Sequence, residues 1–410
     1  MSHPLDLPIA HEIIAADAIL LRGEAVSINE ALNRVAKSFL SAKVPQPGYD
    51  QSGRDGYAIA ADGDAVETGR RFQVIGEEAP AGSIKKIILF EGTACRIMTG
   101  GMIPAGGVRV VPQEDCMVEG GKVTVPAHAL QRKNTFIQKK GEQIAEADLL
   151  AEAGTVLQPE HLALLAATGH TKIEVYRKPR VGFFCSGSEL VGSPEQLVPG
   201  LKISTNRYLL GGLIRQFLAE GEDLGIVKDV QNDLHRAFDQ LKSASFDIVI
   251  STGGMGPGKY DLLEEAFCLA GGEVHFRSLN MRPGKSALFG RFGDILFFGL
   301  PGPPGAVRTL MNEMVGPALL RLQGVKDCGP VAMQARLEQR VDMKNNDVLH
   351  LKAGILSFAS GFACVRLAGR LEIATCFILF PPGRSVYQPS SEVEVHLAYS
   401  PFASQIFAVA

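Results

Sequence analysis

Two cations and three carboxylates are the residues of this 410-residue chain whose types and spacing most clearly suggest chemistry. Arg282 and Lys285 stand on either side of a Pro-Gly turn, which suits clamping an anion better than pairing with a mobile surface carboxylate. Glu189, Asp229 and Asp261 each follow a predicted strand, where a hard cation such as Mg²⁺ could bridge carboxylates to phosphate oxygens. Together these residues predict magnesium-assisted phosphate chemistry.

A glycine-rich loop at residues 251–261 contains Gly253 and Gly254 and leads into a predicted helix. Glycines leave backbone N–H groups open toward a ligand at a helix start, where the partial positive charge favours phosphate or another oxyanion. Taken alone, such a loop is as often an ordinary tight turn. Likewise, Asp261 could cap the helix beginning at Leu262 and Asp229 could cap a turn, and for either residue alone capping is the commoner role.

The elements that must position these residues are three continuous apolar runs of strand length. The runs are residues 180–185, 246–250 and 295–300. Such runs are typical of strands covered on both faces in a parallel sheet, and helical periodicity fills the gaps at residues 206–220 and 231–243. Loops at the carboxyl ends of neighbouring strands converge on one crevice in such a sheet, so we predict a single catalytic α/β module.

The pattern changes twice upstream of this module, which predicts one domain inserted into another. Residues 9–40 and 149–169 show helical spacing, with a capping box from Ser27 to Glu30 and Pro159 at a helix-opening position. We expect these two helical stretches to pack together as one layer. Short strands bounded by Gly or Pro occupy the segment between them and return near the C-terminus. The clearest lie at residues 71–75, 108–111, 122–125, 332–340, 377–380 and 393–397.

The predicted fold class is therefore a multidomain α/β plus β protein, whose α/β domain has three layers and a parallel-rich sheet. The other expected parts are a helical linker domain, an inserted small β domain and a C-terminal domain resembling a β-barrel. The expected bounds are 1–43 with 138–177 for the linker domain, 44–137 for the inserted domain, 178–326 for the α/β domain and 327–410 for the C-terminal domain.

Composition favours a cytoplasmic protein with several cores. The chain is 46% hydrophobic and has a formal net charge of −3, which gives no overall basic bias toward nucleic acid. No apolar stretch reaches the length of a membrane span, and the first residues lack the basic start and apolar run of a signal peptide. The 7 cysteines form no Cys-x-x-Cys pair, which favours reduced thiols over disulfides or a zinc site.

Two polar loops of the inserted domain, residues 50–58 and 96–104, are each explicable as turn chemistry when taken singly. The whole set of motifs, in this order, resembles the molybdopterin molybdenumtransferase family, which is related to the gephyrin E domain. The family's Arg-Ile-Met-Thr-Gly is intact at residues 96–100, and its other motifs have similar counterparts. These counterparts are residues 52–58, 139–143, 186–190, 205–206, 253–261, 282–285 and 301–304.

This resemblance implies an enzyme that binds adenylylated molybdopterin and molybdate and, with Mg²⁺, inserts the metal at the dithiolate while AMP is released. It also implies an elongated homodimer, with the site between the α/β domain of one subunit and parts of the other. Molybdopterin adenylyltransferase and recipient molybdoenzymes are the protein partners that such a function suggests.

The family's site residues carry over onto matching positions. Arg282 and Lys285, with Ser286, would hold molybdate, while Thr205 and Asn206 would lie near the pterin nucleotide with Gly253 and Gly254. Asp55 and Thr99 would come from the inserted domain and face the partner's cleft. The metal ligands implied are Glu189, Asp229 and Asp261, and the residues implied in catalysis are Asp55, Glu189, Asp229, Asp261 and Lys285.

Several positions depart from the family's pattern, and each departure removes a charge or a hydrogen bond. The departures are Gln143, Ser188, Gly256, Ser278 and Pro303, and Arg370 is a candidate for the arginine that the family has in its C-terminal domain. Two alternatives therefore stay open beside the active transferase. One is a paralogue that binds the pterin, the cofactor or a partner without inserting metal. The other is a nucleotide hydrolase on a similar α/β domain, against which the loops at residues 50–58 and 96–104 argue.

Overall fold

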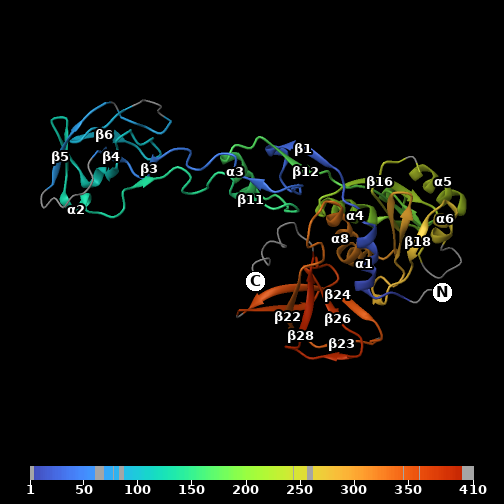
Figure 1. Cartoon of the computed structure of the whole chain (residues 1–410). Helices are drawn as coiled ribbons and strands as arrows, with labels where there is room; N and C mark the ends of the chain where they lie inside the picture. Colours follow the sequence, from blue (N-terminus) through green and yellow to red (C-terminus); the bar gives the residue numbers. More distant parts are fainter. Residues whose placement is uncertain are drawn as a thin grey trace.

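The computed structural model describes residues 4–60, 69–76, 78–82, 87–242, 244–255, 262–344, 346–359 and 361–398. Figure 1 shows an elongated molecule with a small β domain at one end, a linker in the middle and an α/β domain at the other end. A C-terminal β domain lies beside the α/β domain (Figure 1). Within the described residues, no helix is both long and apolar enough to cross a membrane.

The α/β domain is built on a six-stranded sheet in the order β16-β13-β17-β21-β20-β18. The first four strands are parallel neighbours, and β20 and β18 continue the sheet in antiparallel pairings. The three expected strands are confirmed as the adjacent strands β13, β17 and β21. The bounds are β13 Arg180–Ser186, β16 Glu220–Val227, β17 Ile248–Thr252, β18 Glu273–Phe276, β20 Leu288–Phe292 and β21 Ile295–Leu300.

Helices cover both faces of this sheet, which explains why its strands are apolar without alternation. On β17, Ile248 and Ile250 pack into a core that includes residues of α1, α4, α7, η4 and α8, whereas Val249 points into a second core with α5 and α6. The helical bounds are α1 Leu7–Asp17, α4 Thr205–Gln216, α5 Gln231–Lys242, α6 Leu263–Leu269, α7 Pro304–Leu310, the π-helix η4 Met311–Val315 and α8 Gly316–Leu322.

The linker region differs from the helical layer that we expected. Helix α1 ends at Asp17, and the chain then forms β1 (Gly23–Ser27), which pairs with β12 (Lys172–Tyr176). The predicted capping box is present, since Glu30 Oε2 accepts hydrogen bonds from Ser27, but it opens only the short 3-10 turn η1 (Ile28–Glu30). A partner strand some 150 residues away along the chain has therefore overridden local helical spacing.

The second helical stretch is also shorter than expected. Residues 149–151 form β11 (Leu149–Ala151), which pairs with β2 (Leu40–Ser41), and only α3 (Pro159–Ala167) is helical, with Pro159 at its first position as predicted. Helix α1 packs in the core of the α/β domain, whereas Leu165 of α3 belongs to a separate core in the linker. The expectation that the two stretches form one layer was therefore wrong.

The inserted β domain contains a six-stranded sheet in the order β7-β4-β6-β5-β9-β8. Its strands near residues 71–75, 108–111 and 122–125 were predicted from turn-bounded apolar runs and are confirmed as β5, β7 and β9. The bounds are β4 Gly56–Ile59, β5 Arg70–Val74, β6 Thr93–Ile97, β7 Arg109–Pro112, β8 Met117–Glu119 and β9 Lys122–Val125.

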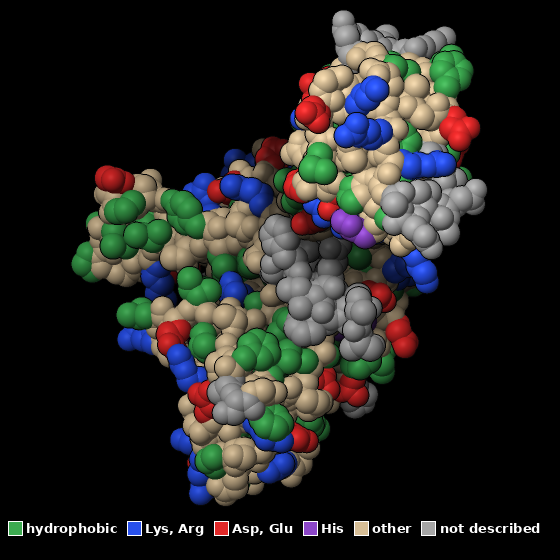
Figure 2. All heavy atoms as spheres, turned by 90° about the vertical axis from the view of Figure 1, so that its left-hand side faces the viewer, with side chains coloured by type: hydrophobic (Ala, Val, Ile, Leu, Met, Phe, Trp, Pro, Cys, Tyr) green, Lys and Arg blue, Asp and Glu red, His purple; other side chains and the backbone are tan. Residues whose placement is uncertain are grey.

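On the face of the molecule shown in Figure 2, acidic and basic side chains lie interspersed.

The C-terminal domain is a closed five-stranded barrel, as its strand-like runs led us to expect. The strands follow in the order β24-β25-β22-β28-β26, and β26 pairs back onto β24 to close the ring. The α/β domain adds a short strand, β19 (Met281–Arg282), parallel to β24. The barrel bounds are β22 Ala332–Leu337, β24 Leu349–Ala359, β25 Phe362–Leu367, β26 Cys376–Phe380 and β28 Glu392–Leu397.

A buried carboxylate and a histidine join the barrel to the α/β domain. Glu313 on η4 is fully buried, and its Oε2 lies 2.8 Å from Nδ1 of His396 on β28. Burial by itself opposes protonation of His396, but hydrogen bonds and the charges of Glu313 and Glu394 outweigh burial, so the pKa of His396 lies above its usual value. The charged pair therefore stabilises the folded state at pH values where His396 is protonated.

We expect the free energy of unfolding to depend on this pair with a definite sign. The pKa of His396 is raised in the folded state. The stabilisation from its pair with Glu313 is therefore complete below the unfolded pKa of about 6.5 and is lost as pH rises through the folded pKa. His396→Gln should remove that decline in stability above about pH 6.5, as measured by urea unfolding across a pH series. His235→Gln on α5, which covers the other face of the sheet, is the matched control. An unchanged pH profile in His396→Gln would contradict the assignment.

Candidate functional site

A crevice opens where the chain changes direction across the parallel sheet. From β13 the chain crosses to β16 on one side and then returns to β17 on the other, and ligands bind at such switch points in open α/β sheets. A cavity of about 550 Å³ lies there. Its lining residues come from the loops after β13, β16, β17, β19 and β21 and from the start of α4. Those named below are Ser186, Glu189, Ser204, Thr205, Asn206, Asp229, Thr252, Gly253, Gly254, Ser286, Pro301, Gly302 and Pro303.

Gly253 holds the loops of three strands together at the floor of this crevice. Its φ is +95°, and a Cβ at this position would lie 2.1 Å from the carbonyl oxygen of Ser186. Its N–H donates a hydrogen bond of 3.0 Å to the carbonyl of Leu300. One amide that we expected to face a ligand is therefore used within the protein, and the glycine is needed for close approach of two backbones. The predicted residues Gly256 and Asp261 lie outside the described residues.

Two of the predicted carboxylates line the crevice. Asp229 follows β16, and its Oδ1 accepts a hydrogen bond from the Ser186 hydroxyl. Its N–H donates to Ser188 Oγ at 3.2 Å, so the serine found where the family has an acid anchors the Asp229 loop. Glu189 also lines the cavity and its side chain is exposed. Two acidic groups thus lie on the same crevice with access to a ligand.

The start of α4 contributes buried polar atoms to the same crevice. Asn206 is only 8% exposed, and its Nδ2 donates to Thr252 Oγ1 at 3.2 Å and to the Gly302 carbonyl at 2.8 Å. Its Oδ1 and the Ser204 hydroxyl are buried and have no hydrogen-bond partner among the residues that the structure describes. Buried polar atoms without partners are costly and uncommon, so these two atoms indicate where a ligand would bind. Thr205 lies between them and also lines the crevice.

Lys285 lines a second cavity of about 530 Å³, which we call the interdomain hollow. It shares Ser286, Pro301 and Pro303 with the crevice, so the two cavities are neighbours. Arg282 does not lie among the described residues lining either cavity; it is half-buried on β19, opposite His350 of the barrel. Of the two cations that the sequence placed in one clamp, only Lys285 is among the described residues lining the hollow.

Sequence reasoning missed Arg308, which lines the interdomain hollow together with Lys285. It lies on α7, in a helix that follows the Pro-Gly-Pro-Pro turn, and the only signal in the sequence was a cation soon after that turn. Arg370, the candidate C-terminal arginine, is exposed and is not among the described residues that line either cavity.

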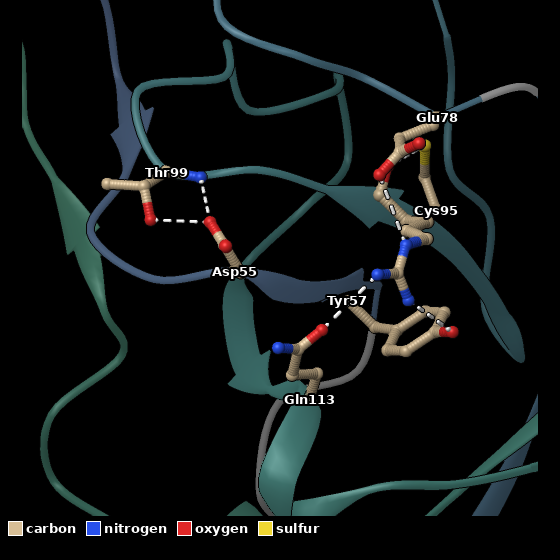
Figure 3. A network of polar contacts seen from close by, with 7 residues as sticks. Asp55, Tyr57, Glu78, Cys95, Thr99 and Gln113 are labelled. Atoms are coloured by element: carbon tan, nitrogen blue, oxygen red, sulfur yellow. Dashed lines mark hydrogen bonds and ion pairs between the residues drawn. The ribbon is translucent and has the colours of Figure 1, made fainter.

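Asp55 and Thr99 form a contact of their own in the inserted β domain (Figure 3). Asp55 Oδ1 accepts hydrogen bonds from Thr99 Oγ1 at 2.6 Å and from its N–H at 2.7 Å. These bonds hold the pKa of Asp55 below its ordinary value, so the exposed carboxylate is ionised at neutral pH. Nearby, Arg96 contacts Tyr57, Glu78 and Gln113. The domain that carries this network lies at the far end of the molecule from the crevice (Figure 1).

Comparison with family models covers most of the chain. Residues 5–169 match the model described as "MoeA N-terminal region (domain I and II)", and residues 182–321 match the model described as "Probable molybdopterin binding domain". The second match contains β13, β17 and β21 and therefore the loops that form the crevice.

Similar proteins extend over the same range. A molybdopterin molybdenumtransferase from Nostoc sp. is 33% identical over 348 residues, which are 82% of this chain and 79% of that protein. One from Haemophilus influenzae is 30% identical over 353 residues, 85% of this chain and 83% of that protein. Among solved structures, the molybdopterin biosynthesis MoeA protein from Pyrococcus horikoshii has a TM-score of 0.80 at 26% identity and covers 97% of this chain and 100% of its own.

The role of Gly253 leads to a direct prediction. Gly253→Ala should destabilise the protein by about 2 kcal/mol or more, because a left-handed φ costs an alanine about 1–3 kcal/mol and its Cβ would meet the Ser186 carbonyl. Gly212→Ala in α4 is the matched control; no atom lies within 4 Å of its Cβ position, so it should gain roughly 0.5–1 kcal/mol. Melting temperatures from calorimetry measure both. Equal melting temperatures for Gly253→Ala and the wild type would refute the role.

Proposed function

Because the chain belongs to the molybdopterin molybdenumtransferase family, a family of transferases of molybdenum cofactor biosynthesis, we propose that it inserts molybdate into adenylylated molybdopterin and releases AMP. The observation that carries this proposal is the crevice itself, where unpartnered buried polar atoms and two carboxylates adjoin a hollow lined by cations. A nucleotide-bearing substrate and an oxyanion could occupy such neighbouring cavities at the same time.

The nucleotide-bearing substrate would lie in the crevice. Asn206 Oδ1 can accept a hydrogen bond from the pterin or the base, and the Ser204 hydroxyl can donate or accept one. Both atoms are already desolvated, so a ligand that pairs with them gains these bonds without a further desolvation cost on the protein side. Thr205, Gly253 and Gly254 line the same space and would contact the substrate.

Glu189 and Asp229 fit the donor set that Mg²⁺ uses with phosphorylated substrates. Mg²⁺ commonly binds through one or two carboxylates plus substrate phosphates and keeps several waters, and two carboxylates line this crevice. When bound, the ion would neutralise charge on the phosphate oxygens. Asp261 remains a predicted third ligand.

Lys285 would bind molybdate in the interdomain hollow, next to the end of the substrate that receives the metal. Cleaving a phosphoanhydride depends largely on positioning and on stabilising charge, so the residues need not supply covalent chemistry. Ser186 supports this arrangement because its hydroxyl orients the Asp229 carboxylate. We keep Arg282 as a predicted ligand that could reach the oxyanion from β19.

The proposed enzyme is a homodimer in which Asp55 and Thr99 of one subunit complete the crevice of the other. Within one chain the domain that carries these residues lies at the opposite end of the molecule from the α/β domain, which supports a second subunit as their route to the crevice (Figure 1). We also propose a cytoplasmic location, in keeping with seven free thiols, and exchange of substrate and product with an adenylyltransferase and recipient molybdoenzymes.

Asp229→Asn tests the catalytic proposal. The variant should release AMP from adenylylated molybdopterin about 10- to 150-fold more slowly, because a lost charged contact typically costs about 1.5–3 kcal/mol. Chelation of divalent metal with EDTA should slow the wild type as well. Asp239→Asn on α5, whose carboxylate accepts a hydrogen bond from Lys242, is the matched control and should keep full activity.

The same variants can be scored in a strain that lacks the transferase, by the activity of nitrate reductase. Rescue by the wild type and by Asp239→Asn, without rescue by Asp229→Asn, is the expected pattern. A wild-type chain that binds the adenylylated pterin yet neither releases AMP nor rescues the strain would be a binding protein, and the proposal would be lost.

Subunit mixing tests the shared site. Asp55→Ala and Lys285→Ala should each be inactive alone, because every site in either homodimer lacks one residue. After equal mixing and exchange, roughly a quarter of the wild-type activity should return, since half of the dimers are mixed and each mixed dimer has one intact site. No recovery, with exchange verified by mass spectrometry of the intact dimers, would place Asp55 and Lys285 in the same subunit's site or in none.

A further inference from the structure

The interdomain hollow is bounded by parts of two domains. The loop that carries Lys285 and the start of α7 form one side, and Leu351, Ala353 and Phe377 of the barrel form an apolar wall on the other. None of the described residues that line this hollow is acidic. The two basic side chains that line it, Lys285 and Arg308, therefore face a space with no neutralising carboxylate of its own.

Arg308 is only partly satisfied by the protein. Its Nη2 donates to the Ala374 carbonyl at 3.0 Å, whereas its Nε is buried and has no hydrogen-bond partner within the described chain. No described carboxylate forms an ion pair with it, and burial lowers the pKa of its guanidinium. A cation that is partly desolvated and lacks a counterion is costly, unlike the arginines elsewhere in the chain that pair with Asp or Glu.

The fold holds Lys285 close to the helix that carries Arg308. Gly284 has a φ of +110° and packs so tightly on α7 that a Cβ there would lie 2.9 Å from Leu310 Cδ2. The Lys285 carbonyl is fixed by a hydrogen bond of 2.9 Å from the Leu279 N–H. The Lys285 loop is therefore seated on α7, and its side chain shares the hollow with Arg308.

We propose that Arg308 is the second cation of the oxyanion site, so that with Lys285 it binds a tetrahedral dianion in the interdomain hollow. This inference rests on the proposed function, which supplies molybdate as the dianion. Two positive charges balance the −2 charge of molybdate, and the planar guanidinium offers several donors to oxyanion oxygens. The apolar wall from the barrel lowers the local dielectric and strengthens this pairing. Arg308 thereby adds a cation that the sequence did not single out, and Arg282 stays a predicted ligand from β19.

Calorimetry with the full-length chain and molybdate alone, with and without AMP, tests the inference. Arg308→Gln should weaken molybdate binding at least tenfold, while AMP binding to the crevice stays within twofold of the wild type. Arg308→Lys keeps the charge but loses the fork of donors, so its affinity for molybdate should lie between those of the wild type and Arg308→Gln. Arg321→Gln on α8, whose Nε donates to the Ala15 carbonyl, is the matched control and should leave both affinities unchanged.

The outcomes separate this inference from the proposed function. Unchanged molybdate affinity in Arg308→Gln, or an equal loss of molybdate and AMP binding, would overturn the role of Arg308 and leave the transferase proposal standing. If molybdate binding depends on Arg308 but the wild-type chain never releases AMP, the inference would stand and the proposed function would be refuted. If the melting curve shows that Arg308→Gln does not fold, Arg308→Lys is tested in its place. Molybdate affinity and competition by sulfate that both equal those of the wild type in Arg308→Lys would then overturn the inference.

Discussion

The close approach of Gly253 to Ser186 is the constraint on which the candidate site depends. Ser186 ends β13, Gly253 follows β17, and the Gly253 N–H is bonded to Leu300 at the end of β21. Three strand ends are thereby fixed at one point, and only a residue without a side chain fits between them. Because β13 and β17 lead to opposite sides of the sheet, the same point is where a crevice must open. The anchoring of Asp229 through Ser186 follows from this arrangement, since the loop after β16 reaches the same strand end.

The barrel turns this crevice into a site with two compartments. Strand β19 pairs with β24, Asn312 Nδ2 donates to the Leu397 carbonyl at 3.3 Å, and Glu313 pairs with His396. These contacts place apolar side chains of β24 and β26 opposite α7 and so enclose the interdomain hollow. Glu189 and Asp229 line the crevice together with Lys202, whereas Lys285 and Arg308 line the hollow, and Ser286, Pro301 and Pro303 line both. The described lining of the hollow holds no carboxylate, so its two cations remain available to an anionic ligand.

Elements that depend on short-range sequence patterns could be predicted from the sequence, whereas elements formed by the pairing of distant segments could not. The strands β13, β17 and β21 were predictable because burial on both faces demands unbroken apolar runs. The region after Asp17 was not, because β1 pairs with β12, a strand that is remote in the chain and leaves no local signal. The crevice residues Glu189 and Asp229 could be found because each follows a strand, whereas Thr205 and Asn206 were found only through the family resemblance. The cation that lines the hollow with Lys285 could not be predicted in this way. Nearness to Lys285 in the sequence favoured Arg282, yet the cavity wall is formed by α7 and the barrel, so the arginine that shares the hollow comes from elsewhere.

The departures from the family's pattern also have a physical meaning in this arrangement. Ser188 replaces an acid with a hydroxyl that accepts the Asp229 N–H, so a charge is lost but the loop stays anchored. Pro303 replaces an amide side chain and a backbone donor at the turn before α7, where a donor would otherwise face both cavities. Arg308 lies five residues further on and brings several donors to the hollow that Pro303 borders. The cation on α7 favours a charged anion in the hollow, which the lost neutral donor at the turn would not have done to the same extent. Arg308 thus offers a reason why a chain with so many altered contacts could still bind the proposed oxyanion.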